Sequence, residues 1–131
     1  MCCWNRSGLM RAPCLVLGLG LLLLAVGCGG GETQALPLDQ ELARSSVQKA
    51  MEAWQAGKKP ADLRPEITIG DPAWESGRPL KSFAILRDEE TSDGSNLHIR
   101  VQRTFGDAGD KSESKVIYIV GTSPVITIFP R

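Results

Sequence analysis

The chain has 131 residues, with 15 basic and 15 acidic side chains, one histidine and a formal net charge of zero. A chain of this length can bury one modest core, and its balanced charge provides no basic surface of the kind that binds nucleic acid. The charges are distributed unevenly, because Arg6 and Arg11 are the only charged residues before Glu32.

The first 27 residues have the three parts of a secretory signal peptide. The two arginines precede an unbroken apolar run of 12 residues, from Leu15 to Val26, and small residues follow it. A membrane-spanning helix needs about 17 to 25 apolar residues, so this run is too short to cross a bilayer. The pattern therefore predicts a segment that directs export and is then removed.

The end of the apolar run reads Leu24-Ala25-Val26-Gly27-Cys28. It resembles the lipobox of bacterial lipoproteins, in which the cysteine is acylated and becomes the first residue of the mature protein. The family's pattern usually has leucine three positions before the cysteine, where this chain has Ala25. The alternative is an ordinary signal peptidase that cuts at the same bond, because Ala25 and Gly27 also satisfy the small-x-small rule. That cut would leave Cys28 as a lone exposed thiol in an oxidising compartment, which favours the lipidated product.

The resemblance implies a location and a membrane partner. Cys28 would carry the lipid that holds the mature protein in the bacterial cell envelope, and Gly29 after it matches the sorting rule for the outer membrane, facing the periplasm. The other cysteines, Cys2, Cys3 and Cys14, lie in the removed segment, so no internal disulfide is expected. The mature chain would have 104 residues, 13 of them basic and 15 acidic, for a net charge of about −2. Electrostatic attraction to a membrane would be weak, and the lipid would provide the anchor.

Residues 28–38 are predicted to be the lipidated Cys28 and a flexible tether, which begins with three glycines and precedes the folded part. Asp39 has the properties of a helix N-cap, and Gly57 suits the position just after a helix. A helix is therefore predicted over residues 40–56. Its apolar stripe at helical spacing consists of Ala43, Val47, Ala50, Met51 and Trp54.

Extended segments follow the helix. Strands are predicted at residues 67–69, 80–87, 96–105, 115–120 and 125–129. Residues 73–79 are predicted to form turns around Trp74, and Asp93 with Gly94 is a hairpin signal. Because short turns join the last four strands, antiparallel neighbours are expected. In the third predicted strand, Arg103 interrupts an otherwise apolar row.

The predicted fold class is α+β, with one N-terminal amphipathic helix packed on a four- to five-stranded antiparallel sheet over residues 39–131. This element order resembles the cystatin-like α+β rolls, and the whole chain is similar to small bacterial lipoproteins that carry one such domain. The likeness extends over about residues 39 to 130. It consists of element order alone, so it assigns no site residue.

The candidate binding residues are His98, Arg100 and Gln102, on the polar face of one strand, and Trp74 in its turn. His98 is the only histidine and no nucleophile or metal-ligand set accompanies it, so we expect no catalytic residue, no metal and no cofactor. We expect a non-enzymatic binding or interaction module, whose partner is an envelope protein or ligand and not a nucleic acid. The alternative is a small enzyme or ligand-binding protein that uses the concave face of the sheet, which requires polar groups converging in a cavity.

The lipobox predicts that the mature N-terminus is an acylated Cys28. At least two lipid chains are expected on it, because a single chain gives only marginal membrane binding. Mass spectrometry of the N-terminal peptide checks this, and Cys28→Ser should stall or release the precursor. An unmodified cysteine in a freely soluble product would contradict the prediction.

Overall fold

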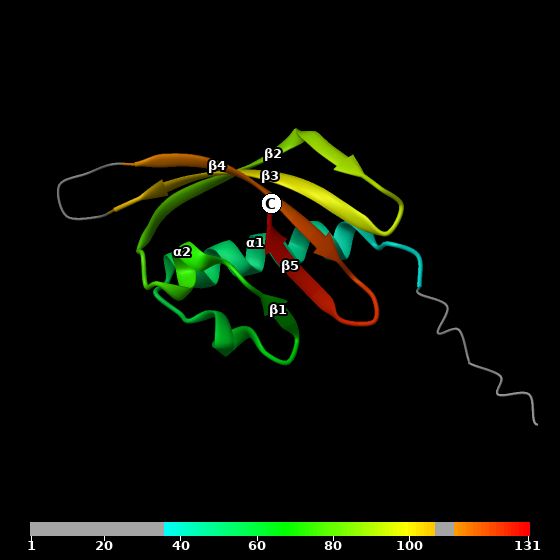
Figure 1. The fold of residues 1–131 in the computed structure, drawn as a ribbon, viewed down its shortest axis with the longest axis horizontal. Helices are drawn as coiled ribbons and strands as arrows, with labels where there is room; N and C mark the ends of the chain where they lie inside the picture. The colour runs from blue at the N-terminus through cyan, green and yellow to red at the C-terminus, as the bar shows by residue number, and fades with distance from the viewer. Residues whose placement is uncertain (1–35, 107–111) are drawn as a thin grey trace, which may run out of the picture. The chain divides into compact units, whose positions relative to one another are not determined.

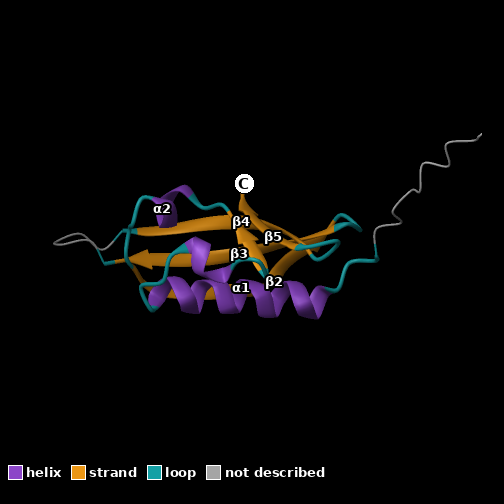
Figure 2. Cartoon of the chain, turned by 90° about the horizontal axis from the view of Figure 1, so that it is seen from below, coloured by secondary structure: helices purple, strands orange, loops and turns teal. Residues whose placement is uncertain are grey.

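The computed structural model describes residues 36–106 and 112–131, which fold into a long helix packed on one face of a sheet, with a shorter second helix (Figures 1 and 2). The described residues all belong to one compact unit. The predicted signal segment, Cys28 and most of the predicted tether lie outside them. Within the described parts of the chain, no helix combines the length and the apolar character needed to span a bilayer.

Helix α1, Gln40–Gln55, confirms the predicted helix to within one residue at its C-terminal end. The Asp39 side chain accepts a hydrogen bond of 2.9 Å from the Leu42 N–H, which satisfies one of the free donors of the first turn. Gly57 follows the helix with a positive φ of 80°, where glycine is favoured because it has no Cβ. The predicted apolar stripe is buried against the sheet.

The sheet has five strands in the spatial order β1-β5-β4-β3-β2. Their bounds are β1 Ile67–Ile69, β2 Leu80–Ser92, β3 Asn96–Phe105, β4 Glu113–Gly121 and β5 Ile126–Pro130. Strands β2 to β5 are antiparallel neighbours in chain order, as their short connections predicted.

Strand β1 departs from the predicted all-antiparallel sheet, because it pairs in parallel with β5. Ile67 lies opposite Ile126, and Ile69 lies opposite Ile128. Short turns require antiparallel pairing only between strands that follow one another directly in the chain. All of β2, β3 and β4 lie between β1 and β5 in the chain, and a connection of that length permits either direction.

Three local features also differ from the sequence prediction. A short helix α2, Pro72–Glu75, replaces the predicted turn around Trp74, because Asp71 caps it and proline suits its first position. A 3₁₀ turn, Pro60–Leu63, precedes β1. Strand β2 continues five residues beyond its predicted end, and an irregularity in its pairing between Leu86 and Thr91 accommodates the acidic run there.

The core lies between α1 and the helix-facing side of the sheet. The alternation predicted for β3 places Leu97, Ile99 and Val101 on that side, each with at most 2% of its surface exposed. Their neighbours on β4 include Tyr118, which lies opposite Ile99 and is fully buried. The residues of opposite parity in β3 therefore lie on the other face, away from α1.

Arg103 follows the same alternation and lies on the helix-facing side, although it carries a charge. Its Nη1 donates to Asp71 Oδ2 at 2.8 Å and to the Tyr118 hydroxyl at 3.2 Å. The Tyr118 hydroxyl in turn donates to Asp71 Oδ2 at 2.5 Å. The pKa of Tyr118 is raised well above its usual value, first by burial and then by this hydrogen bond to the Asp71 carboxylate. Arg103, which interrupts the apolar row, therefore belongs to a largely buried ionic network.

Breaking this network on one side should destabilise the domain strongly. Arg103→Met leaves the Asp71 carboxylate buried without its cation, so the free energy of unfolding should fall by about 3–5 kcal/mol. Asp71→Asn combined with Arg103→Met removes both charges, retains a residue that can cap α2, and should recover most of the loss. Urea denaturation of both variants measures the difference.

Arg100→Met provides the matched control, because Arg100 lies on the same strand and pairs with Glu89 at a partly exposed position. Its loss should change stability by no more than about 1 kcal/mol. If the Arg103 single variant and the double variant were equally unstable, the ion pair would not explain the burial of Arg103.

Candidate functional site

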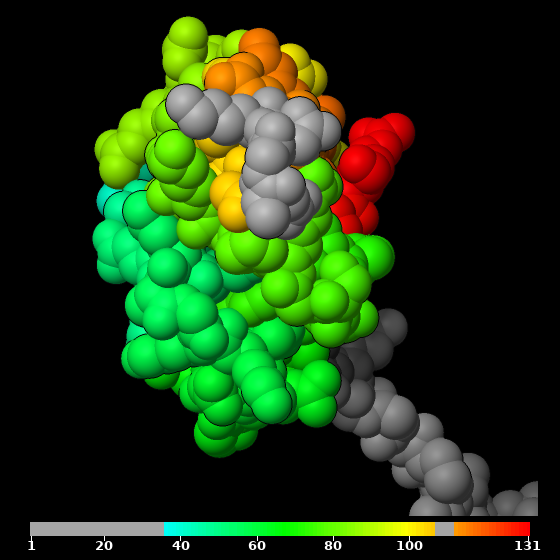
Figure 3. All heavy atoms as spheres, turned by 90° about the vertical axis from the view of Figure 1, so that its left-hand side faces the viewer, coloured from blue at the N-terminus to red at the C-terminus, as the bar shows by residue number. Residues whose placement is uncertain are grey.

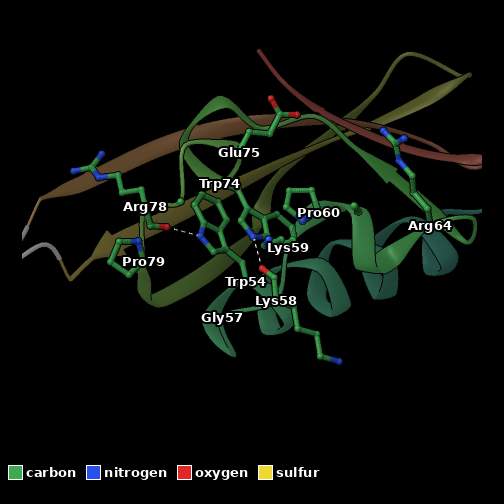
Figure 4. Close-up of a pocket in the computed structure, with 12 residues that line it drawn as sticks. Trp54, Gly57, Lys58, Lys59, Pro60, Arg64, Trp74, Glu75, Arg78 and Pro79 are labelled. Carbon is green, nitrogen blue, oxygen red and sulfur yellow. Dashed lines mark hydrogen bonds between the residues drawn. The ribbon is translucent and has the colours of Figure 1, made fainter.

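A pocket of about 610 Å³ lies beside the C-terminal end of α1, where the segment after the helix meets α2 and the start of β2 (Figure 4). Its apolar lining comes from two tryptophans, Trp54 and Trp74, and two prolines, Pro60 and Pro79. Figure 3 views the molecule from this end, where green residues of the segment between α1 and β2 form much of the lower surface. The pocket is thus built from segments that are separate in the sequence.

The two tryptophans form the floor of the pocket. Their rings are stacked with centroids 5.2 Å apart and an interplanar angle of 2°. The indole N–H of Trp54 donates to the Arg78 carbonyl, and that of Trp74 donates to the Lys58 carbonyl, each at 2.7 Å. Each indole N–H is therefore hydrogen-bonded to the backbone of the segment that follows the helix carrying the other tryptophan. With exposures of 3% and 4%, both rings are fixed parts of the core edge.

The charged side chains around the pocket are mostly basic. Lys58, Lys59 and Arg64 are exposed, and within the described residues none of them forms an ion pair. Arg78 is half-buried, with its guanidinium 3.9 Å above the Phe105 ring centroid and a hydrogen bond to the Ser112 hydroxyl. Glu75 is the one acidic residue of the lining. Among the residues that line the pocket, four carry a positive charge and one carries a negative charge.

The predicted binding residues of β3 lie elsewhere. His98, Arg100 and Gln102 follow one another along the face of the sheet that is turned away from α1, and none of them lines the pocket. Each has an acidic neighbour. His98 Nε2 lies 3.0 Å from Asp93 Oδ2, Arg100 pairs with Glu89, and Gln102 Nε2 donates to Glu113 Oε2 at 3.4 Å. These three residues form a polar column on an open face of the sheet.

Trp74 is the one predicted binding residue that the structure places at the pocket. Sequence reasoning missed the basic residues around it. The pair Lys58-Lys59 directly after α1 was a usable signal for a basic surface. Lysines just beyond the C-terminal end of a helix interact favourably with the helix dipole, so their charges are expected to lie near that end. Arg64 and Arg78 line the same pocket as these lysines only because the folded chain brings the segments before and after α2 together. Cys28, the predicted lipidation site, lies outside the described residues.

No further chemistry can be assigned by likeness or by ligand geometry. No family model, no curated protein and no solved structure matches the chain. In residues 36–106 and 112–131, no three His, Cys, Asp or Glu side chains are grouped so that they could hold a metal ion. The pocket and the polar column must therefore be judged on their own contacts.

Asp93, the neighbour of His98, should make stability depend on pH. Its pKa is lowered well below the usual value, first by the backbone N–H groups of Asn96 and Ser95, at 2.7 and 2.9 Å, and then by His98. A depressed carboxyl pKa stabilises the fold above the unfolded pKa of about 3.9, and this stabilisation is lost as pH falls through the folded pKa.

Asp93→Asn should therefore be less stable than the parent at pH 7, and the difference should narrow progressively below pH about 4. Urea denaturation across this range measures it. Asp88→Asn, an exposed acid of the same hairpin, controls for the loss of one charge. A difference that stayed constant with pH would show that the carboxylate bonds do not contribute.

Proposed function

We propose that this chain is a lipid-anchored protein of the bacterial cell envelope, whose folded domain is a binding module for an anionic ligand with an apolar body. The pocket beside Trp54 and Trp74 is the observation that carries the binding part of the proposal. The resemblance of residues 24–28 to a lipobox carries the anchor.

The size and rigidity of the pocket support a small-ligand site. Pockets for small molecules commonly enclose about 300–1,000 Å³ and combine apolar walls with a few polar groups. The volume of about 610 Å³ lies in that range. Because the tryptophan rings are held by stacking and by two hydrogen bonds, little side-chain entropy would be lost when a ligand contacts the adjoining surface.

The charges around the pocket support an anion. Lys58, Lys59 and Arg64 are exposed, so their attraction for a ligand acts through water and contributes modestly, by about 1 kcal/mol for a close pair. Several such contributions together distinguish an anion from a neutral molecule of the same shape. They also predict that affinity falls as the salt concentration rises.

The arrangement supports binding rather than catalysis. General acid–base work needs a group whose pKa lies near the working pH and which reaches the reacting atom. The pocket is lined by cations and by Glu75, whereas the single histidine lies on the other side of the sheet. The enzyme alternative needed His98, Arg100 and Gln102 to converge in a concave cavity, and their open column lacks that geometry.

The binding proposal can be tested with two dyes of nearly the same shape. 8-Anilino-1-naphthalenesulfonate carries one negative charge, and N-phenyl-1-naphthylamine is its neutral counterpart. Mature protein with Cys28→Ser avoids any lipid into which the dyes could partition. The anionic dye should bind saturably and about three- to tenfold more tightly, a difference of roughly 0.7–1.4 kcal/mol.

Lys59→Gln and Arg64→Gln should each weaken the anionic dye about two- to fivefold and leave the neutral dye unchanged. Lys115→Gln, an exposed lysine of β4 that does not line the pocket, is the matched control. Equal affinity for both dyes would contradict an anion site, and the absence of saturable binding would contradict a ligand site altogether. The state of Cys28 tests the anchor separately.

A further inference from the structure

The exposed apolar side chains are concentrated at one end of the domain. Among the described residues the large exposed hydrophobic side chains are Leu36, Leu42, Val125 and Phe129, with exposures of 73, 38, 53 and 46%. Single exposed apolar residues are common on protein surfaces and need no explanation. Here, however, Leu36 begins the described chain, Leu42 lies in the first turn of α1, and Val125 lies in the turn between β4 and β5. This turn is next to the start of the described chain in both views (Figures 1 and 2).

Two hydrogen bonds join the start of the described chain to this turn. The Leu36 N–H donates to the Ser123 hydroxyl at 3.2 Å, and the Asp39 N–H donates to the Thr122 hydroxyl at 3.1 Å. Leu42 lies in the first turn of α1, which Asp39 caps. We call Leu36, Leu42 and Val125 the entry tip. Residues 121–125, which form the turn that carries Val125, include no charged side chain.

We propose that the entry tip rests on the lipid surface to which the protein is anchored and thereby fixes the orientation of the domain. This inference rests on the proposed lipid at Cys28. That residue precedes Leu36 by eight positions, which span at most about 28 Å even when fully extended. The anchor therefore keeps this end of the domain close to the bilayer, and at such effective concentration a small apolar surface is sufficient for contact.

The proposed orientation has a consequence for the pocket. Helix α1 has 16 residues and is therefore about 24 Å long. Leu42 lies in its first turn, and Trp54 lies in its last turn beside the pocket. With the entry tip on the lipid, α1 leads away from the bilayer, and the pocket opens at the end of the domain that is exposed to soluble ligands.

Fluorophores attached to single cysteines test the orientation on the lipidated protein. Acylation occupies the thiol of Cys28, and no other cysteine follows it, so Val125→Cys and Ala56→Cys each introduce one reactive site. Both are exposed, and Ala56 lies just after the far end of α1. The vesicles consist of phosphatidylcholine with a fraction of nitroxide-labelled headgroups, which keeps repulsion of Asp39 and Glu41 by anionic lipid out of the comparison.

Nitroxide should quench the label at position 125 about threefold more strongly than the label at 56, because an interfacial contact lies within roughly 10 Å of the headgroups. Leu36→Ser, at a highly exposed position, should clearly reduce this difference, and the tether alone should account for what remains. Phe129→Ser, which alters an exposed apolar side chain outside the entry tip, should preserve their difference.

Two failures are distinguishable. Protein that floats with the vesicles but shows equal quenching at both positions would retain the anchor and overturn the entry tip. Protein that does not float with the vesicles would overturn the anchor, and the inference with it. An undiminished difference in Leu36→Ser would also count against the entry tip as the cause.

Discussion

The interaction on which the domain depends most is the buried ion pair between Asp71 and Arg103. Arg103 occupies an inward position of a central strand, where an unpaired charge would be very costly. Asp71 compensates it, accepts a hydrogen bond from the buried Tyr118 hydroxyl, and also caps α2 through the Ala73 N–H at 2.9 Å. One carboxylate thus connects the sheet with the segment that carries Trp74. Asp71 thereby links the position of α2 to that of Arg103.

The pocket depends on this connection. Because Asp71 holds α2 against the sheet, Trp74 reaches the last turn of α1 and stacks on Trp54. The Arg103 guanidinium lies 5.7 Å from the Trp54 ring centroid, so the ion pair and the aromatic pair are adjacent parts of one assembly. The two crossed indole hydrogen bonds then place the backbone of Lys58 and Arg78 at the edge of the pocket. The backbone that carries these two basic residues is therefore positioned by the same contacts that complete the core.

Helix α1 gives the domain two different ends. Its N-terminal end meets the uncharged turn between β4 and β5 and carries the exposed residues Leu36 and Leu42. Its C-terminal end meets α2 and is surrounded by basic side chains. An anchor that joins the chain near the first end and a ligand that is attracted to the second end are physically compatible, because about 24 Å of helix separates them.

The sequence by itself determined the elements whose signals are local. Asp39, the apolar stripe and Gly57 predicted α1, and alternation with short turns predicted the antiparallel order of β2 to β5, because each signal acts over a few residues. Only the tertiary structure decided the parallel pairing of β1, the partners of Arg103 and the gathering of basic residues around the tryptophan pair. Asp71 lies 32 positions from Arg103 and 47 from Tyr118. Contacts at such separations depend on sheet register and burial, and a local pattern along one chain records neither.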